Sequence, residues 1–557
     1  MTRRVRWMEA WRQNLRANGW FPVSWVGVLG LQLRNDPNLH LAMELSLVGM
    51  VVVAATVPKL TRVWQGASRG VRVLAGVSTV GALQAMTADF WRQCLANPTA
   101  LAELFGRLHE QLWLLVVAAV AAMGLGAAAV YTLMVCFWRV LWPELVVLGR
   151  SLGRVERIGL AAACGLLLCT ATWTHQRVAI EGLPYDAIYT TDGTLERSHP
   201  TAFVHFSHEE NDLRQPLFAV CALPLTAPAL CAGDLLSPLV GPCRARFVTW
   251  VQALLLVAAF AYLARCLELE GAFARVGFVA WLSAGYATHI LCAQVDQYAV
   301  ALFWLCFFFA CREEKRSAWL LGAVAAVGSL ATSAVAVGLH VVSRAGGRVW
   351  RCMRKLLVAA GAFWVAAALF CRFELGLIVR EQLELYSNFS GEGLSLAERG
   401  WQFLAFMVMN FRAPASGPAC RMMKAGPFWS WQLATDIPEA TRWLGAALLV
   451  VLGVGATLAW RRVRFARVCA GWVCFAWLLL GVAGWGTAEN GLVLYVLYFA
   501  WAFVGLAALL LERLMRAVGA VRWLGALYLV LALLTLCNTL PALADMLAFL
   551  HLYYPAR

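Results

Sequence analysis

The stretch GLVLYVLYFAWAFVGLAALLL, residues 491–511, decides the fold class, because it contains no Asp, Glu, Lys, Arg or Pro. An α-helix needs about 17 to 25 predominantly apolar residues to cross the hydrocarbon of a bilayer. This run has that length and therefore predicts a transmembrane helix. The same criterion, applied outward from it, finds further apolar runs along most of the 557-residue chain.

The composition agrees with this prediction, since 61% of the residues are hydrophobic and 14% are charged. So few charged residues cannot cover soluble domains of this total length. The formal net charge of +15 could indicate nucleic-acid binding, but the arginines cluster between apolar runs, where the positive-inside rule explains them. We therefore expect an all-α polytopic membrane protein with roughly 12 to 14 transmembrane helices, GT-C-like in the sense given below, with juxtamembrane helices on the outer face and no nucleic-acid partner.

The predicted spans are residues 41–58, 112–138, 157–174, 247–264, 274–292, 297–311, 317–341, 356–374, 441–459, 468–484, 491–511 and 521–547. The run 317–341 has a polar centre, Ala331-Thr332-Ser333, and is interpreted as two short helices that turn near one face. Residues 216–240 are expected to stay at the outer surface, because Pro breaks helices and Asp234 is costly in lipid. The prolines of this segment are Pro216, Pro224, Pro228 and Pro238, followed by Pro242.

These runs divide the chain into four regions. Residues 1–150 are expected to hold an N-terminal interfacial helix and one or two spans, and 151–375 a catalytic core with a first outer loop at 175–245. Residues 376–440 form a second outer loop, and 441–557 the C-terminal spans.

Arginine-rich connections set the predicted orientation. Residues 342–355, 460–467 and 512–522 are rich in arginine and contain one acid, Glu512, and are therefore expected in the cytoplasm. The acidic loop 175–215 and the long connection 375–440 are then expected on the outer face.

The candidate catalytic residues are acids predicted at this outer face. The stretch SHEENDLRQPLF, residues 207–218, crowds acids before a Pro, and Asp296 opens a later span on the same face. A general base or a cation site needs carboxylates that converge in this way. The alternatives are solvated surface acids for the loop and a helix N-cap for Asp296. The candidates are Asp186, Asp192, Glu210, Asp212 and Asp296.

A third outer element, GWGTAENGLVLYVLYFAW, adds polar and aromatic side chains, among them Trp485, Tyr495 and Tyr498. Glu489 and Asn490 are predicted to line a pocket there, while the aromatic residues are equally typical of a membrane-interface belt.

The order of these features resembles the multi-spanning GT-C glycosyltransferases, which include protein mannosyltransferases and aminoarabinose transferases. Gln215-Pro216-Leu217 stands in place of that family's His-Pro-Pro-Leu, and Val295-Asp296 in place of its Pro-Asp. The resemblance covers residues 157–345 and departs from the family in having one Pro in the first motif. Beyond that range it extends to the number of spans.

This resemblance implies transfer of a sugar from a lipid-linked, polyprenyl-phosphate donor to a glycan, lipid or protein acceptor at the outer face of the plasma membrane. Loop cations would bind the donor phosphate, and Gln215 and Pro216 would belong to the pocket. The resemblance leaves open whether a divalent cation takes part. The candidate phosphate-binding residues are Arg214, Arg380, Arg412 and Arg421.

The alternative function is that of a polytopic transporter or lipid flippase. Such proteins need polar residues buried within their spans and often contain inverted repeats. The sequence shows neither feature plainly, because its charge gathers between the apolar runs.

Overall fold

The computed structural model describes residues 64–96, 112–180, 183–184, 187–189, 215–241, 243–312, 314–345, 348–370, 376, 379–380, 394–423, 426–434, 437–485 and 492–556. The chain forms two compact units, residues 1–83 with 87–143 and residues 84–86 with 144–557. The predicted interfacial helix at the N-terminus and the predicted span 41–58 lie outside the described residues.

Helix α4 (Arg69–Ala96) and the 40-residue helix α6 (Leu112–Ser151) contribute the described part of the first unit. Trp138 Nε1 donates to Ser78 Oγ at 3.0 Å, and Trp64 Nε1 donates to Thr132 Oγ1 at 3.1 Å. These bonds tie two helices that are distant in sequence. The predicted boundary at residue 138 is wrong, because α6 continues through Pro143 to Ser151.

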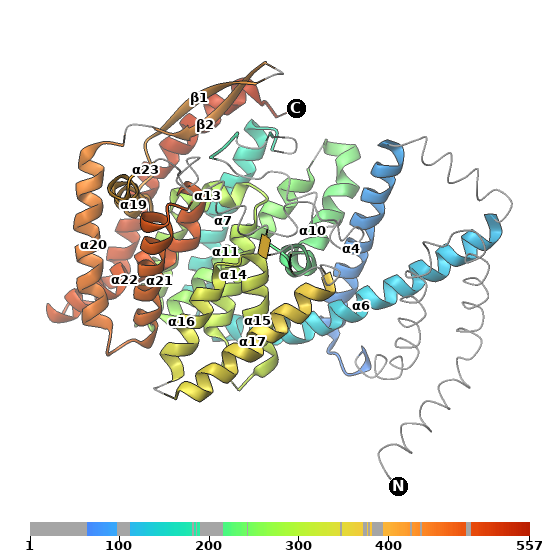
Figure 1. Ribbon diagram of the computed structural model, residues 1–557, viewed down its shortest axis with the longest axis horizontal. Coiled ribbons are helices and arrows are strands. Elements are labelled where there is room, and N and C mark those ends of the chain that lie inside the picture. The colour runs from blue at the N-terminus through green and yellow to red at the C-terminus, as the bar shows by residue number, and fades with distance from the viewer. Residues whose placement is uncertain are drawn as a thin grey trace, which may run out of the picture. The chain divides into compact units, whose positions relative to one another are not determined.

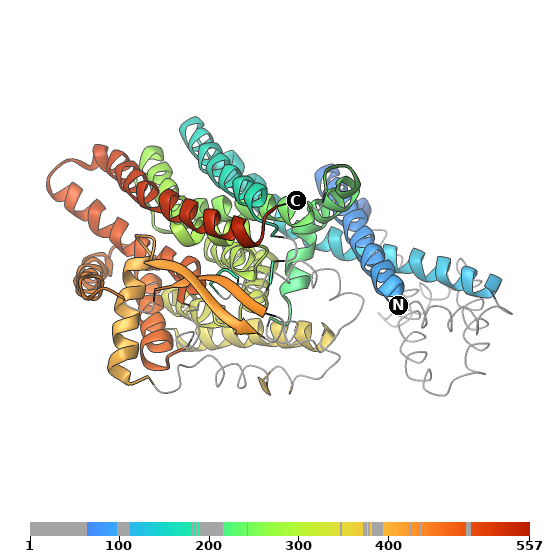
Figure 2. The same ribbon diagram turned by 90° about the horizontal axis from the view of Figure 1, so that it is seen from above.

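The second unit holds the remaining helices and one hairpin (Figures 1 and 2). The helices of its first half are α7 (Arg154–Arg177), α10 (Phe218–Val240), α11 (Arg244–Cys266), α12 (Ala272–Ser283), α13 (Tyr286–Ala293), α14 (Gln297–Ala310), α15 (Arg316–Ser329), α16 (Ser333–Ala345) and α17 (Val349–Phe370). Those of its second half are α19 (Leu396–Met409), α20 (Glu439–Ala459), α21 (Arg464–Ala476), the π-helix η3 (Trp477–Val482), α22 (Leu492–Ala517), the short 3-10 helix η4 (Val521–Trp523) and α23 (Leu524–Tyr553).

Eight helices of the described part are long and apolar enough to cross a membrane, and the bent pair α12–α13 is a ninth candidate. The protein is therefore an all-α polytopic membrane protein, as the composition predicts. The predicted spans from residue 441 onward correspond to α20, α21 with η3, α22 and α23.

Burial separates the central helices from those at the periphery. Helix α14 carries no charged residue and is buried on all sides, with Trp304 and Phe307 among the largest fully enclosed side chains. A helix that is hydrophobic all round belongs in a core. Helices α20 and α23 instead expose apolar side chains, which lipid would cover. These include Leu449, Val450, Val454, Val530, Leu533 and Leu534.

The prediction that prolines keep residues 216–240 from forming a helix is wrong. Helix α10 runs through Pro224, Pro228 and Pro238 and is long enough to span. Neighbouring groups can satisfy the backbone around a proline in such a helix, and α10 packs against α11 and α15. Asp234 has an ion-pair partner, because Arg244 Nε lies 3.9 Å from its Oδ1.

The polar centre of 317–341 does divide that run, as predicted. Helix α15 ends at Ser329 and α16 begins at Ser333, with Leu330 N bonded to Ala326 O and Ser333 N to Leu330 O. The predicted span 274–292 is also divided, because α12 and α13 meet at an angle of 67°.

The predicted second outer loop contains ordered structure. Helix α19 starts with a capping box between Ser395 and Glu398, and strands β1 (Ser416–Met423) and β2 (Gly426–Leu433) form an antiparallel hairpin. Figure 1 shows the hairpin beside the end of α23, and Trp429 stacks on Tyr553 with 4.8 Å between ring centroids. Tyr554 OH also donates to Trp429 O at 2.7 Å.

The loops of the second unit gather at two opposite ends. We call the end that carries the hairpin and residues 178–180, 183–184, 187–189, 215–217, 294–296 and 330–332 the hairpin end. We call the other the arginine end, which carries residues 266–271, 311–312, 314–316, 343–345, 460–464 and 512–523. The arginine-rich loops therefore share one end, as predicted. Which side of the membrane that end faces stays a prediction.

Candidate functional site

The segment from α12 to α14 is a helix broken twice, first at residues 284–285, beside the middle of α23, and again at residues 294–296, at the hairpin end. Each break leaves backbone carbonyls without their helical partners. Side chains from other helices replace those partners. Thr539 Oγ1 donates to Ala284 O at 2.9 Å, and Gln252 Nε2 donates to Leu291 O at 3.0 Å and to Gln294 O at 2.7 Å. The breaks are thus fixed parts of the fold.

Asp296 lies at the second break as the N-cap of α14. Its Oδ1 accepts a hydrogen bond from Gln297 N at 2.6 Å, and the residue is 2% exposed. A carboxylate at this place is stabilised by the positive end of the helix dipole. The structure therefore supports the interpretation of Asp296 as a helix N-cap. A catalytic Asp296 would have to serve both as this cap and as the base.

Aromatic and hydroxyl side chains from other helices surround the start of α14. The rings of Tyr298 and Tyr495 meet edge to face with 6.1 Å between centroids, and Trp485 Nε1 donates to Tyr495 OH at 2.5 Å. Ser333, at the start of α16, is hydrogen-bonded to Tyr498. The predicted third outer element therefore does lie beside the Asp296 break. Its Glu489 and Asn490 lie outside the described residues.

Gln215 and Pro216 directly precede α10 and lie beside the C-terminal end of α15. Leu217 N donates to Gly328 O at 3.1 Å, and a Cβ added to Gly328 would lie 2.4 Å from Leu217 Cβ, so the contact requires glycine. Pro216 is buried, and Gln215 Oε1 is buried without a partner among the described residues. The Pro motif thus packs against the split between α15 and α16.

The first outer loop is ordered where it meets the hairpin. Tyr189 N donates to Trp431 O at 3.1 Å, and Trp431 N donates to Ala187 O at 2.9 Å. Tyr189 OH accepts from Trp431 Nε1 at 3.0 Å and lies 2.7 Å from Tyr286 OH on α13. Burial raises the pKa of Tyr189 to about 12, so its phenol stays protonated. Sequence analysis missed these residues, whose pairing spans more than 200 positions.

Most of the acids predicted for this site cannot be placed. Asp186, Asp192, Glu210 and Asp212 lie outside the described residues, as does Arg214. Within the described part of the chain, no group of three His, Cys, Asp or Glu side chains could hold a metal ion.

The described arginines among those predicted to bind phosphate lie in three different places. Arg421 is exposed on β1, and Arg380 is exposed in a sparsely described part of the second outer loop. Arg412 lines a cavity of about 440 Å³ between α19, the hairpin, α20 and α23, which we call the Arg412 groove. Its remaining polar side chains are Thr441 and Asn538, and its apolar lining includes Ala405, Val408, Met409, Leu433, Leu444 and Ala542.

The Arg412 groove and the Asp296 break are connected through helix α13. Asn538 Oδ1 accepts from Ala413 N at 2.7 Å, and its neighbour Thr539 bonds Ala284 just before α13 begins. Asp296 follows the other end of α13, whose 8 residues span about 12 Å at 1.5 Å per residue. The structure therefore does not bring Arg412 into contact with Asp296.

A layer of buried polar side chains lies behind the Asp296 break. Thr170 Oγ1 is 2.9 Å from His289 Nδ1, and Thr249 Oγ1 is 3.1 Å from His175 Nε2. The expectation that spans lack buried polar residues is therefore wrong. The missed signal was a Thr or a His near the end of an apolar run, as in TATWTH at residues 170–175.

This polar layer stops short of the opposite end. Its members come from the last two turns of α7, the first two of α11 and the short helix α13. The following part of α14 is filled by Phe303, Trp304 and Phe307, all fully buried. Among the described residues, the layer thus belongs to the hairpin end.

No protein-family model, curated protein or solved structure matches this chain.

Proposed function

We propose that the protein transfers a sugar from a polyprenyl-phosphate donor to an acceptor at the hairpin end of the membrane domain. The observation that carries this proposal is the Arg412 groove, in which one guanidinium borders apolar walls from α19, the hairpin, α20 and α23, of which α20 and α23 are of span length. A lipid-linked phosphate is complementary to this groove, because it joins an anionic head to an apolar chain. Arg binds phosphate with two parallel hydrogen bonds, which also orients the group.

The reaction needs a base as well as a donor site. The acceptor hydroxyl loses its proton as its oxygen attacks the anomeric carbon, and the bond from that carbon to the phosphate oxygen breaks. Polyprenyl phosphate leaves with the bonding electrons, next to the cation. A carboxylate within hydrogen-bond reach of the hydroxyl takes the proton. We assign this role to Asp296 or to an acid of the first outer loop, Asp186, Asp192, Glu210 or Asp212.

The order of motifs supports the proposal. The resemblance to GT-C glycosyltransferases rests on Gln215-Pro216-Leu217 and Val295-Asp296, and both segments lie at the hairpin end, each at an interruption between helices. In this proposal the membrane is the plasma membrane and the hairpin end faces outward.

Transport is the second candidate, because the hydrogen-bonded pairs Thr170–His289 and Thr249–His175 are buried among helices of the membrane domain. A transport path would have to continue to the arginine end. The aromatic residues of α14 interrupt polar side chains there, within the part of the chain that the structure describes. This arrangement favours a site entered from one face.

The test is transfer of radiolabelled sugar from polyprenyl-phosphate donors in membranes that contain the protein. Arg412→Ala is expected to lower transfer about 10- to 100-fold, because a hydrogen bond to a charged group is worth about 1.5–3 kcal/mol and 1.4 kcal/mol is tenfold. Arg421→Ala is the matched control, since Arg421 is exposed on β1 outside the groove. Equal transfer rates in the two variants would mean that the Arg412 groove does not bind the donor phosphate, and the proposal would lose its main support.

A further inference from the structure

The arginine end contains a second cavity, which we call the arginine cavity. Its volume is about 800 Å³, within the range of about 300–1,000 Å³ usual for ligand sites. It is lined by the connections that follow α11, α14 and α20, by the last two turns of α16 and by the start of α21. The cationic lining residues are Arg312, Arg344, Arg462 and Arg464.

The charges of this lining are unequally balanced. Two acids, Glu268 and Glu314, face the cavity together with the four arginines. Among the described residues, neither Arg312 nor Arg464 forms an ion pair, and the hydrogen bond found for the Arg344 side chain goes to the carbonyl of Phe309, at 3.5 Å. Positive charge therefore remains available to a ligand in the cavity.

His340 is an independent sign of a ligand in the same cavity. It is 3% exposed, packs against the rings of Phe308, Phe309 and Phe465, and lines the cavity. Neither of its ring nitrogens has a hydrogen-bond partner among the described residues. A buried polar group without a partner is costly, and an anionic oxygen inside the cavity would accept its N–H.

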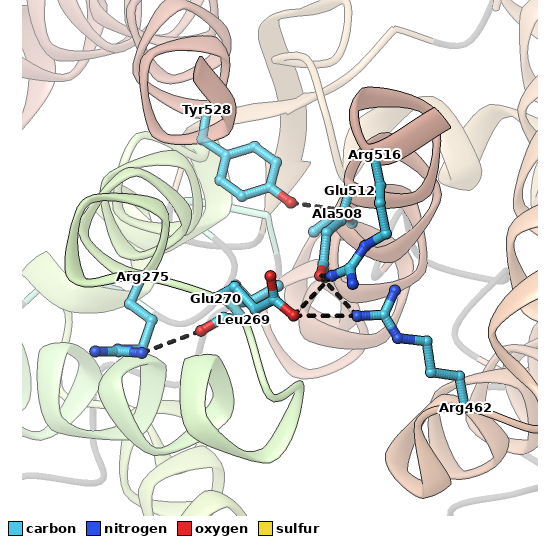
Figure 3. Close-up of polar contacts among 8 residues, drawn as sticks. All are labelled: Leu269, Glu270, Arg275, Arg462, Ala508, Glu512, Arg516 and Tyr528. Atoms are coloured by element: carbon cyan, nitrogen blue, oxygen red, sulfur yellow. Dashed lines mark hydrogen bonds and ion pairs between the residues drawn. The ribbon is translucent and has the colours of Figure 1, made fainter. Parts of the chain in front are cut away.

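An ion cluster fixes one wall of the cavity (Figure 3). Glu512 Oε1 pairs with Arg516 Nη2 at 2.6 Å and with Arg462 Nη2 at 3.4 Å, and Glu270 pairs with the same two guanidinium groups at 2.8 and 3.4 Å. Arg275 Nη1 donates to Leu269 O at 3.0 Å in the same view. The connections after α11 and α20 are thus held together before a ligand arrives, which lowers the cost of binding.

We propose that the arginine cavity binds a phosphate ester, with Arg312, Arg344 and Arg464 contacting its oxygens and His340 donating from the floor. Guanidinium groups match phosphate geometry and are its usual partners. The same chemistry is found in the headgroup of an anionic phospholipid and in a soluble phosphate ester. Basic pockets between membrane helices are a known mode of headgroup binding.

The experiment uses the purified full chain and two probes. Glycerol 3-phosphate is titrated in a neutral detergent, and phosphatidylglycerol is compared with phosphatidylcholine in nanodiscs, with affinity and thermal stabilisation as readouts. Binding of the soluble ester assigns the cavity to a soluble ligand. Stabilisation by phosphatidylglycerol alone assigns it to a headgroup.

Variants locate the binding at the cavity. Arg312→Gln with Arg464→Gln is expected to weaken the bound probe about 10-fold or more, and His340→Phe is expected to weaken it without loss of packing. Arg461→Gln is the matched control, since Arg461 is exposed at the same end but does not line the cavity. All four arginines and Arg461 are exposed, so the Gln variants should fold normally. Absence of binding by both probes, or equal affinity in the double variant and the control, would overturn the proposal.

Discussion

The hairpin end and the arginine end hold their loops together by different interactions. At the hairpin end, neutral side chains bond the backbone of broken helices, as Gln252 does at Leu291 and Gln294. At the arginine end, paired charges such as Glu512 and Arg462 join the end of α22 to the connection after α20. In these two examples, the buried donor at the hairpin end is neutral and bonds backbone, whereas the ion pair at the arginine end keeps one partner where water can reach it.

The largest expected effect separates catalysis from capping at Asp296. Asn caps helices about as well as Asp, so Asp296→Asn should keep the start of α14 intact while removing a base. Sugar transfer should fall on the order of 10² to 10⁴-fold, with an unchanged thermal midpoint. Asp296→Ala, which also removes the cap, should in addition cost about 1 kcal/mol of stability. Full transfer activity in the Asn variant would leave Asp296 with the capping role alone.

The next effect concerns the neutral side chains of the hairpin end. Gln252→Leu is expected to destabilise the protein by about 2 to 6 kcal/mol, because two buried carbonyls lose their donor and each costs about 1–3 kcal/mol. Thermal unfolding in detergent measures it. The matched control is Gln402→Leu, because Gln402 Oε1 is buried without a partner among the described residues. A loss as large in the control would show that Gln252 contributes by volume rather than by its hydrogen bonds.

The smallest effect is expected at the arginine end. The Glu512 side chain is 4% exposed, but Arg462 and Arg516 are 40% and 34% exposed, which screens the pairs. Glu512→Gln should therefore cost about 1 to 2 kcal/mol. The loss should shrink at about 1 M salt, where the Debye length is about 3 Å. The loss of stability in Gln252→Leu should not change with salt, because its hydrogen bonds are neutral. An equal salt response of the two variants would mean that the two ends are not held together by different interactions.

The sequence by itself determined the fold class and the gathering of arginine loops. Both depend on hydropathy or charge added over a short stretch of the chain. From Leu492 onward the apolar run at 491–511 lies within helix α22, and the cations of 460–467 lie close together in the sequence. The polar centre at Ala331-Thr332-Ser333 was also sufficient to predict a break, because local polarity opposes a continuous apolar helix.

What only the tertiary structure decided depends on partners far apart in the chain. Prolines that a local rule treats as helix breakers stay inside α10, which packs against α11 and α15. His289 meets Thr170 across 119 positions, and Trp431 meets Tyr189 across 242. The arginine cavity is likewise assembled from loops between residues 266 and 465. Hydropathy along the chain adds residue by residue, whereas hydrogen bonds and cavities exist only once distant segments have been packed together.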